Sequence, residues 1–116
     1  MKIYIIDIDE TICRHKDRSA PYDEGEPIKE RIEFFNKLYD EGNQIIYWTA
    51  RGAYTGLDHA ELTERQLDEW GAKRTELRMN KPKYDYWIDD KAFNVDSYFM
   101  NLGITDGDLQ TTSTTS

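Results

Sequence analysis

The sequence predicts an α/β fold with a mostly parallel sheet and helices on its faces. Short runs rich in β-branched and aromatic residues are typical of buried strands. They alternate along the chain with segments whose apolar residues recur at helical spacing. This alternation favours a parallel sheet covered by its connecting helices. With 116 residues, the chain has room for one domain and one core.

The first half of the chain is expected to contain two strands and one helix. Residues 2–8 carry the first apolar run, and residues 13–25 are polar and interrupted by proline and glycine, which indicates a long loop or a small flap. Pro27 suits the first turn of a helix, and Gly42 is placed to cap its end. The apolar positions at helical spacing are Ile28, Ile32, Phe35 and Leu38. Residues 44–48 are expected to form the second strand.

The second half is expected to alternate in the same way. Residues 63–66 have the form of a capping box, so we expect a helix from there to Gly71. A short strand, a further strand and a helix are expected at residues 77–79, 84–88 and 91–102. Residues 111–116 are hydroxyl-rich with nothing to bury, which predicts a disordered tail after a core of residues 1–110.

Composition narrows the class of partner. Acidic residues outnumber basic ones by 23 to 15, and the net charge of −8 disfavours binding to nucleic acid. No stretch approaches the ~20 apolar residues of a membrane span, and the first residues do not resemble a signal peptide. Cys13 is the only cysteine, which favours a reducing cytoplasm, and we interpret it as a buried or incidental thiol. His15 and His59 lack the spacing of zinc ligands and are interpreted as surface or loop residues.

Polar side chains stand at or just before the carboxyl ends of the expected strands, where parallel sheets bind ligands. They are Asp7, Asp9, Thr11, Thr49, Lys81, Asp89 and Asp90. Taken singly, each has a plain structural explanation: the acids could cap turns or helices, the threonine could be an ordinary strand-end hydroxyl, and the lysine could be solvated in a loop. Their shared position favours one site.

These residue types match phosphoryl transfer to an aspartate. A carboxylate can attack phosphorus to form an acyl phosphate, and Mg²⁺ held by acids from two strand ends, Asp7 and Asp89, would screen the opposing charges. A lysine, a threonine hydroxyl and backbone N–H groups can orient the phosphoryl oxygens. A second acid nearby can protonate the leaving group and then activate water.

The sequence resembles the haloacid dehalogenase (HAD) superfamily of phosphohydrolases over about residues 2–100. Asp7-Ile8-Asp9-Glu10-Thr11 is similar to the first motif of the superfamily, DxDxT. Thr49 ends an apolar strand as in the second motif, Lys81 stands where the lysine of the third is expected, and Asp89-Asp90 resembles the acidic fourth.

The resemblance implies a role for each acid and a three-layer Rossmann-like fold. Asp7 would be the nucleophile and Asp9 the acid/base, with Thr11 in support. Mg²⁺ would be coordinated by the Asp7 side chain, the Asp9 main-chain carbonyl and Asp89. Asp90 would assist through a bound water or a hydrogen bond to the lysine.

Two assignments around the phosphate stay open. Thr49, Ala50 and Lys81 are expected to bind the substrate phosphate, although Lys83 lies close enough in sequence to replace Lys81. Arg51 follows the phosphate-binding threonine, and it either contacts substrate or is a solvated surface arginine.

Most HAD enzymes carry a cap domain, but the two insertion points here, residues 12–26 and 52–80, are too short for a sizeable one. The chain therefore resembles the small capless phosphatases, which act on bulky substrates or are covered by a neighbouring subunit. An open site makes self-association an expectation, with the flap at residues 14–22 and exposed aromatic side chains as candidate contacts.

We therefore expect a cytoplasmic, Mg²⁺-dependent phosphomonoester hydrolase acting on a sugar phosphate or a similar metabolite. One alternative is a phosphatase for a macromolecular phosphate, on protein or a nucleic-acid end. Others are a non-catalytic, receiver-like phosphoaspartate switch and a protein that binds metal without catalysis. The motif order disfavours a receiver, because here the lysine precedes the second pair of acids.

Overall fold

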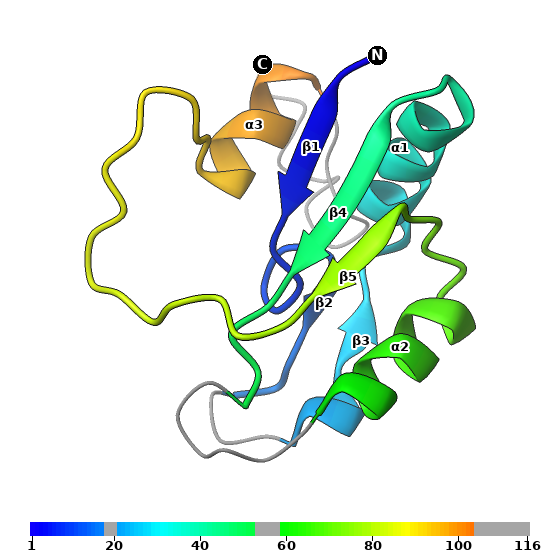
Figure 1. Cartoon of the computed structure of the whole chain (residues 1–116), viewed down its shortest axis with the longest axis vertical. Coiled ribbons are helices and arrows are strands. Elements are labelled where there is room, and N and C mark those ends of the chain that lie inside the picture. The colour runs from blue at the N-terminus through cyan, green and yellow to red at the C-terminus, as the bar shows by residue number, and fades with distance from the viewer. Residues whose placement is uncertain (18–20, 53–58, 104–116) are drawn as a thin grey trace. The chain divides into compact units, whose positions relative to one another are not determined.

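The computed structural model describes residues 1–17, 21–52 and 59–103 (Figure 1). Contacts divide the chain into an N-terminal unit, residues 1–83, and a C-terminal unit, residues 84–116, and each is described by itself. The elements of the N-terminal unit are β1 (Ile3–Ile6), β2 (Cys13–Arg14), the 3₁₀ turn η1 (Tyr22–Glu24), β3 (Glu26–Pro27), α1 (Lys29–Asp40), β4 (Gln44–Trp48), α2 (Ala60–Glu69) and β5 (Glu76–Arg78). The described part of the C-terminal unit contains α3 (Val95–Asn101).

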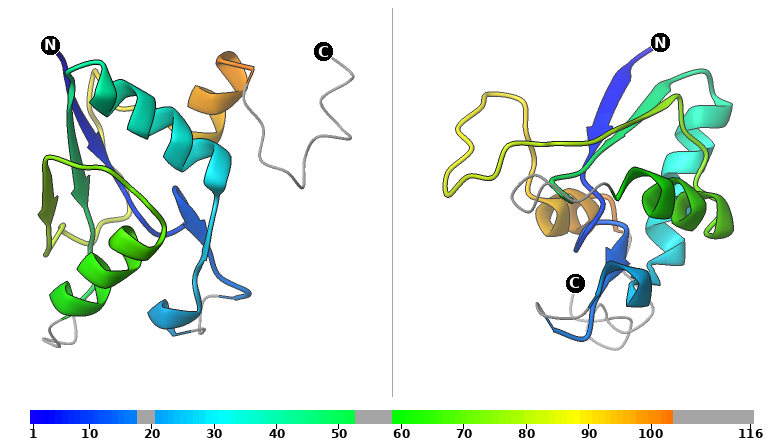
Figure 2. Two further views of the ribbon diagram at one scale, coloured as in Figure 1. Left: turned by 90° about the vertical axis from the view of Figure 1, so that its right-hand side faces the viewer. Right: turned by 60° about the horizontal axis from the view of Figure 1, so that its bottom comes forward.

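The N-terminal unit is built on a parallel sheet with the strand order β1-β4-β5, so the α/β class is confirmed. Ile5 pairs with Ile46, and Ile46 pairs on its other side with Glu76. Both crossovers run in the same direction along the sheet, which places α1 and α2 on one face when the connections are right-handed. All views show these two helices on the same side of the strands (Figure 2).

The core lies between the sheet and these helices. The central strand β4 is buried over Ile45, Ile46 and Tyr47, and α1 and α2 contribute Ile32, Phe35 and Leu67. On β1, Ile6 is buried whereas Ile3 and Ile5 are more than half exposed, because successive side chains of a strand point to opposite faces. A helix layer on that second face remains a prediction.

Several expected elements are confirmed. The strand over residues 44–48 matches β4, and the short strand expected near residues 77–79 is β5, displaced by one residue. The helix before Gly42 is α1, and Gly42 has a φ of 97°, the left-handed conformation that suits a glycine after a helix. The expected small flap is also present, because β2 and β3 pair as an antiparallel ribbon with η1 between them.

Two predicted helix starts are wrong. Pro27 belongs to β3 and pairs with Cys13, so α1 begins only at Lys29. α2 begins at Ala60, which puts Thr63 inside the helix, where its hydroxyl donates to the carbonyl of His59 at 2.7 Å. The start signal at Pro27 was outweighed by its pairing with Cys13, whereas Thr63 lies one turn inside a helix that begins earlier.

The strand predicted over residues 84–88 is also wrong in this structure. The segment is irregular, and Tyr86 and Ile88 are 85% and 94% exposed. Among the described residues of the C-terminal unit, α3 is the regular element, so the segment has no strand of its own unit to pair with. The helix predicted over residues 91–102 is shortened to α3, because the Asn94 side chain caps it by accepting hydrogen bonds from two backbone N–H groups.

In the part of the chain that the structure describes, no helix is long and apolar enough to cross a membrane. The tail predicted over residues 111–116 lies outside the described residues.

Candidate active site

A tight turn after β1 carries the first two acids. The backbone N–H groups of Thr11 and Ile12 both donate to the carbonyl of Ile8, and Glu10 adopts a left-handed φ of 61°. Ile8 and Ile12 are fully buried and anchor the turn in the core. The carboxylates of Asp7 and Asp9 are therefore presented from a backbone that packing holds in place.

A second turn brings Lys81 to the end of β4. The backbone N–H of Thr49 donates to the backbone carbonyl of Arg78 at 3.0 Å, and the N–H of Lys81 donates to the carbonyl of Thr49 at 2.8 Å. Asn80, between them, has a φ of 62°, a conformation that asparagine tolerates better than most residues. Since β1 and β4 are neighbours, the structure brings Asp7, Thr49 and Lys81 to one edge of the sheet.

The ionised form of the Asp7 carboxylate is disfavoured by its burial. Burial raises its pKa above the ordinary value of 3.8, and the positive charge of Lys81 is the strongest opposing influence. One carboxylate oxygen accepts the N–H of Ile8 at 2.9 Å, and among the described residues the other receives no hydrogen bond. The effect of Lys81 on Asp7 favours Lys81 over Lys83 as the lysine of this site.

The donor chemistry of Asp7 suits a hard divalent cation. A half-buried carboxylate with an oxygen left open is a ligand that Mg²⁺ accepts, and added positive charge would offset the burial that raises the Asp7 pKa. Asp7 and the main chain of the adjoining turn are the groups of the N-terminal unit that fit this metal.

Arg51 is buried, contrary to the interpretation of a solvated surface arginine. The residue is 1% exposed. Its Nε and Nη2 donate to the two carboxylate oxygens of Asp9 at 3.1 and 2.8 Å, and its Nη1 donates to Thr63 Oγ1 at 3.1 Å and Gln66 Oε1 at 2.6 Å. In this structure the guanidinium donates its hydrogen bonds to acceptors within the protein and is not open to a substrate.

Sequence reasoning missed the residues that hold this arginine. Thr63 and Gln66 are three residues apart on α2, so both side chains lie on the helix face that meets Arg51. The same residues produced the capping-box signal, which hid their role. The flap adds Tyr22, whose ring lies 4.7 Å from the Arg51 guanidinium carbon and whose carbonyl accepts from Gln66 at 2.6 Å.

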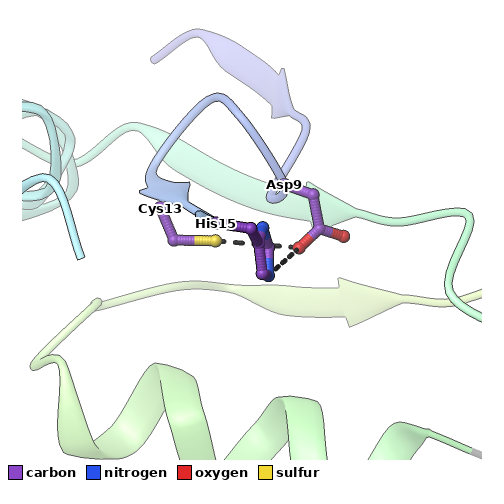
Figure 3. A group of neighbouring side chains, drawn as sticks. All are labelled: Asp9, Cys13 and His15. Carbon is purple, nitrogen blue, oxygen red and sulfur yellow. Dashed lines mark hydrogen bonds and ion pairs between the residues drawn. The ribbon is translucent and has the colours of Figure 1, made fainter. Parts of the chain in front are cut away.

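Asp9, Cys13 and His15 form a further cluster beside the first turn (Figure 3). The Cys13 thiol donates a hydrogen bond to Asp9 Oδ1 at 3.7 Å, a distance that the larger sulfur atom allows, and His15 Nε2 lies 3.6 Å from the same oxygen. The His15 side chain is only 8% exposed. His15 was expected to be a surface or loop residue; it lies in a loop, with its side chain largely buried.

This cluster has metal-ligating atoms within 4.8 Å of one another, but the state of two of its groups disfavours binding of a cation. Burial raises the pKa of the Cys13 thiol to about 12, so the thiolate that a metal would need is disfavoured. The Asp9 carboxylate is already paired through both oxygens with Arg51. The prediction of a buried thiol is confirmed, and the cluster packs around Asp9 as support.

The remaining predicted site residues occupy ordinary backbone positions. Thr11 belongs to the first turn, and its carbonyl accepts from Arg31 at 3.0 Å. Ala50 is half-buried between Thr49 and Arg51, and the N–H of Arg51 donates to the Thr49 hydroxyl oxygen at 3.2 Å. Thr49 is fully buried, and in this contact its hydroxyl oxygen is the acceptor.

Asp89 and Asp90 lie in the C-terminal unit, in an exposed irregular segment. Asp89 accepts from the backbone N–H of Lys91 at 2.9 Å, and this hydrogen bond, followed by one involving Asp90, lowers the Asp89 pKa. The N-terminus of α3 is capped by Asn94, so neither acid is the cap of that helix. The pairing of Asp89 with Asp7 at one metal stays a prediction.

No protein-family model matches the chain, and no curated protein matches it. The fold is similar to the crystal structure of an MCSG target from Vibrio cholerae, with a TM-score of 0.73 and 23% sequence identity. The alignment covers 84% of this chain and 87% of the other. At this level of identity the likeness concerns the fold alone.

Proposed function

We propose that this protein is a Mg²⁺-dependent phosphomonoester hydrolase of the HAD superfamily, with a three-layer Rossmann-like fold and Asp7 as its nucleophile. The observation that carries the proposal is the meeting of Asp7, Thr49 and Lys81 at one edge of the parallel sheet, with Asp9 two residues beyond Asp7. A nucleophile, a phosphate-binding hydroxyl, a cation and an acid/base are thereby combined in one place. A sugar phosphate or a similar metabolite is the proposed substrate.

The chemistry proceeds in two displacements on phosphorus. A carboxylate oxygen of Asp7 attacks the phosphoryl group, the bond to the alcohol oxygen breaks, and Asp9 donates the proton that this oxygen needs. Water then attacks the phosphorus of the acyl phosphate while Asp9 removes its proton, which releases inorganic phosphate and restores Asp7. Thr49 and Lys81 hold the phosphoryl oxygens throughout.

The metal would be held by the Asp7 side chain, the Asp9 main-chain carbonyl and Asp89. When bound, Mg²⁺ supplies positive charge that lets the anionic phosphate approach the Asp7 carboxylate. Because burial raises the pKa of Asp7, the ionised nucleophile depends on positive charge more than an exposed aspartate would.

The test is hydrolysis of p-nitrophenyl phosphate and a panel of sugar phosphates, with Mg²⁺ and with a chelator. Asp7→Asn is expected to lower kcat at least about 1000-fold, because it removes the nucleophile. Asp40→Asn is a matched control, since Asp40 is an exposed acid that pairs with Lys73 on the surface. Unchanged turnover in Asp7→Asn would rule out the proposal.

A second variant tests the predicted metal ligand in the C-terminal unit. Asp89→Asn is expected to raise the Mg²⁺ concentration for half-maximal activity by about tenfold or more. An unchanged Mg²⁺ requirement would remove Asp89 from the metal site. A wild-type protein that forms a lasting acyl phosphate without turnover would instead favour the receiver-like switch.

A further inference from the structure

The guanidinium of Arg51 is committed to the protein on every side that the structure describes. It is 1% exposed, and four hydrogen bonds join it to Asp9, Thr63 and Gln66. An arginine held in this way cannot also clasp a phosphate without giving up partners that are themselves buried. Its action on the reaction must therefore pass through one of the groups it holds.

Among those groups, Asp9 is the one with a chemical role in the proposed reaction. The fork of Arg51 contacts both carboxylate oxygens, at 3.1 and 2.8 Å. The other neighbours of this carboxylate are weaker, because the Cys13 thiol is a weak donor that bonds Oδ1 at 3.7 Å and His15 Nε2 lies 3.6 Å from the same oxygen. Within the described residues, Arg51 thus determines the direction in which the Asp9 carboxylate points.

The direction of Arg51 is set in turn by two segments that are far apart in sequence. Thr63 and Gln66 hold Nη1 from α2, while the Tyr22 ring covers the guanidinium from the flap. Gln66 is itself fixed by the Tyr22 carbonyl at 2.6 Å. The flap, α2 and the turn after β1 therefore meet in one hydrogen-bonded assembly around Arg51.

We propose that Arg51 is a positioning residue that aims the Asp9 carboxylate for proton transfer, and that it makes no contact with substrate. This inference rests on the proposed function. It differs from both alternatives left open by the sequence, substrate contact and a solvated surface position, and it gives the short flap a catalytic purpose, since Tyr22 supports the arginine.

The two displacements depend differently on Asp9, and this difference gives a test. p-Nitrophenolate leaves without a proton, so the first displacement on p-nitrophenyl phosphate does not need a well-aimed Asp9. The second displacement always needs a base to take the proton of water. A variant that misaims Asp9 is therefore expected to release one equivalent of nitrophenol rapidly and to accumulate the acyl phosphate on Asp7.

The experiment compares wild type, Arg51→Gln, Asp9→Asn and the double variant with p-nitrophenyl phosphate and Mg²⁺. In Arg51→Gln we expect kcat to fall about tenfold to hundredfold while kcat/KM changes less than about threefold, with a burst of product and phosphoenzyme visible by intact mass after acid quench. In the Asp9→Asn background, Arg51→Gln is expected to have no further effect. Arg74→Gln, which removes surface ion pairs from α2, should behave as wild type.

Several results would overturn the proposal. An increase of KM at unchanged kcat would show that Arg51 contacts substrate. Faster turnover in Arg51→Gln would show that Arg51 restrains Asp9, and an equal loss with and without Asp9 would show that it acts elsewhere. If Arg51→Gln fails to fold, Thr63→Val gives the same test more gently, since it removes one of the two acceptors of Nη1. A burst of nitrophenol from Thr63→Val is then the expected result, and kinetics equal to those of wild type would overturn the inference.

The design separates this inference from the proposed function. A wild-type protein without turnover would overturn the proposed function and the role of Arg51 together. An active, Mg²⁺-dependent wild type combined with an Arg51→Gln variant that shows no burst would overturn the role of Arg51 alone.

Discussion

Replacing Arg51 by methionine should cost far more stability than the same replacement at Arg74, although both arginines make short ion pairs. Arg51 is fully buried, and its loss leaves Thr63 and Gln66 without a donor at buried oxygens. It also leaves the Asp9 carboxylate, whose side chain is 26% exposed, with only partial access to water. Arg74 is paired at 2.7 and 2.8 Å with Glu64 and Asp68, whose side chains are 52% and 70% exposed.

The magnitudes follow from that difference in burial. Breaking a buried ion pair by removing one partner costs about 3–5 kcal/mol, and the partial exposure of Asp9 lowers our expectation for Arg51→Met to about 3 kcal/mol. The Arg74 side chain is 16% exposed, but both of its acidic partners are largely exposed to water. Such pairs contribute about 0.2–1 kcal/mol each, so Arg74→Met should cost about 1 kcal/mol.

Urea denaturation followed by far-UV circular dichroism measures both losses. With a denaturant slope of about 1.5 kcal/mol/M, Arg51→Met should lower the midpoint by about 2 M and Arg74→Met by well under 1 M. Salt at about 0.5 M should reduce the loss at Arg74 and leave that at Arg51 nearly unchanged, because buried pairs are screened less. Equal shifts for the two variants would refute the argument from burial.

Two further stability predictions concern single buried groups. Burial raises the pKa of Asp7 above its ordinary value of 3.8. Between these two values the folded protein binds more protons than the unfolded chain. The stability that this group contributes to the folded state therefore falls as pH rises through that window. In the presence of a chelator, Asp7→Asn should therefore gain stability relative to wild type as pH rises from about 4 to 7. A difference between the two urea midpoints that stays constant over this range would contradict the predicted direction of the pH dependence. Tyr47 is fully buried, and its hydroxyl has no hydrogen-bond partner among the described residues, so Tyr47→Phe should raise the free energy of unfolding by about 1 kcal/mol; a loss of stability would indicate a partner for that hydroxyl.

The residues whose position at a strand end local sequence predicted share one property. Asp7 and Thr49 follow directly on a strand and Asp9 lies two residues beyond Asp7, and the position of a strand end is set by a short apolar run. Lys81 could be predicted for the same reason, since β5 ends at Arg78 and a short turn returns the chain to Thr49.

The strand expected over residues 84–88 shows the limit of such reasoning. Its alternation of aromatic and aliphatic residues satisfies the local requirements of a strand, yet a strand exists only when a second backbone accepts and donates its hydrogen bonds. Within the C-terminal unit the described residues offer no such partner. Pro27 failed for a related reason, because its pairing with Cys13 decided its role.

The amino-acid order by itself determined the α/β alternation, the ends of β1 and β4 and the polar residues that stand there, because periodicity and turn residues act over a few neighbouring positions. Only the tertiary structure decided that Arg51 is buried and occupied by Asp9. Its partners come from the turn after β1, from α2 and from the flap, 12 to 42 residues away on the first two elements. Long-range packing creates that dry environment, and nothing in the residues adjoining Arg51 distinguishes it from an arginine in water.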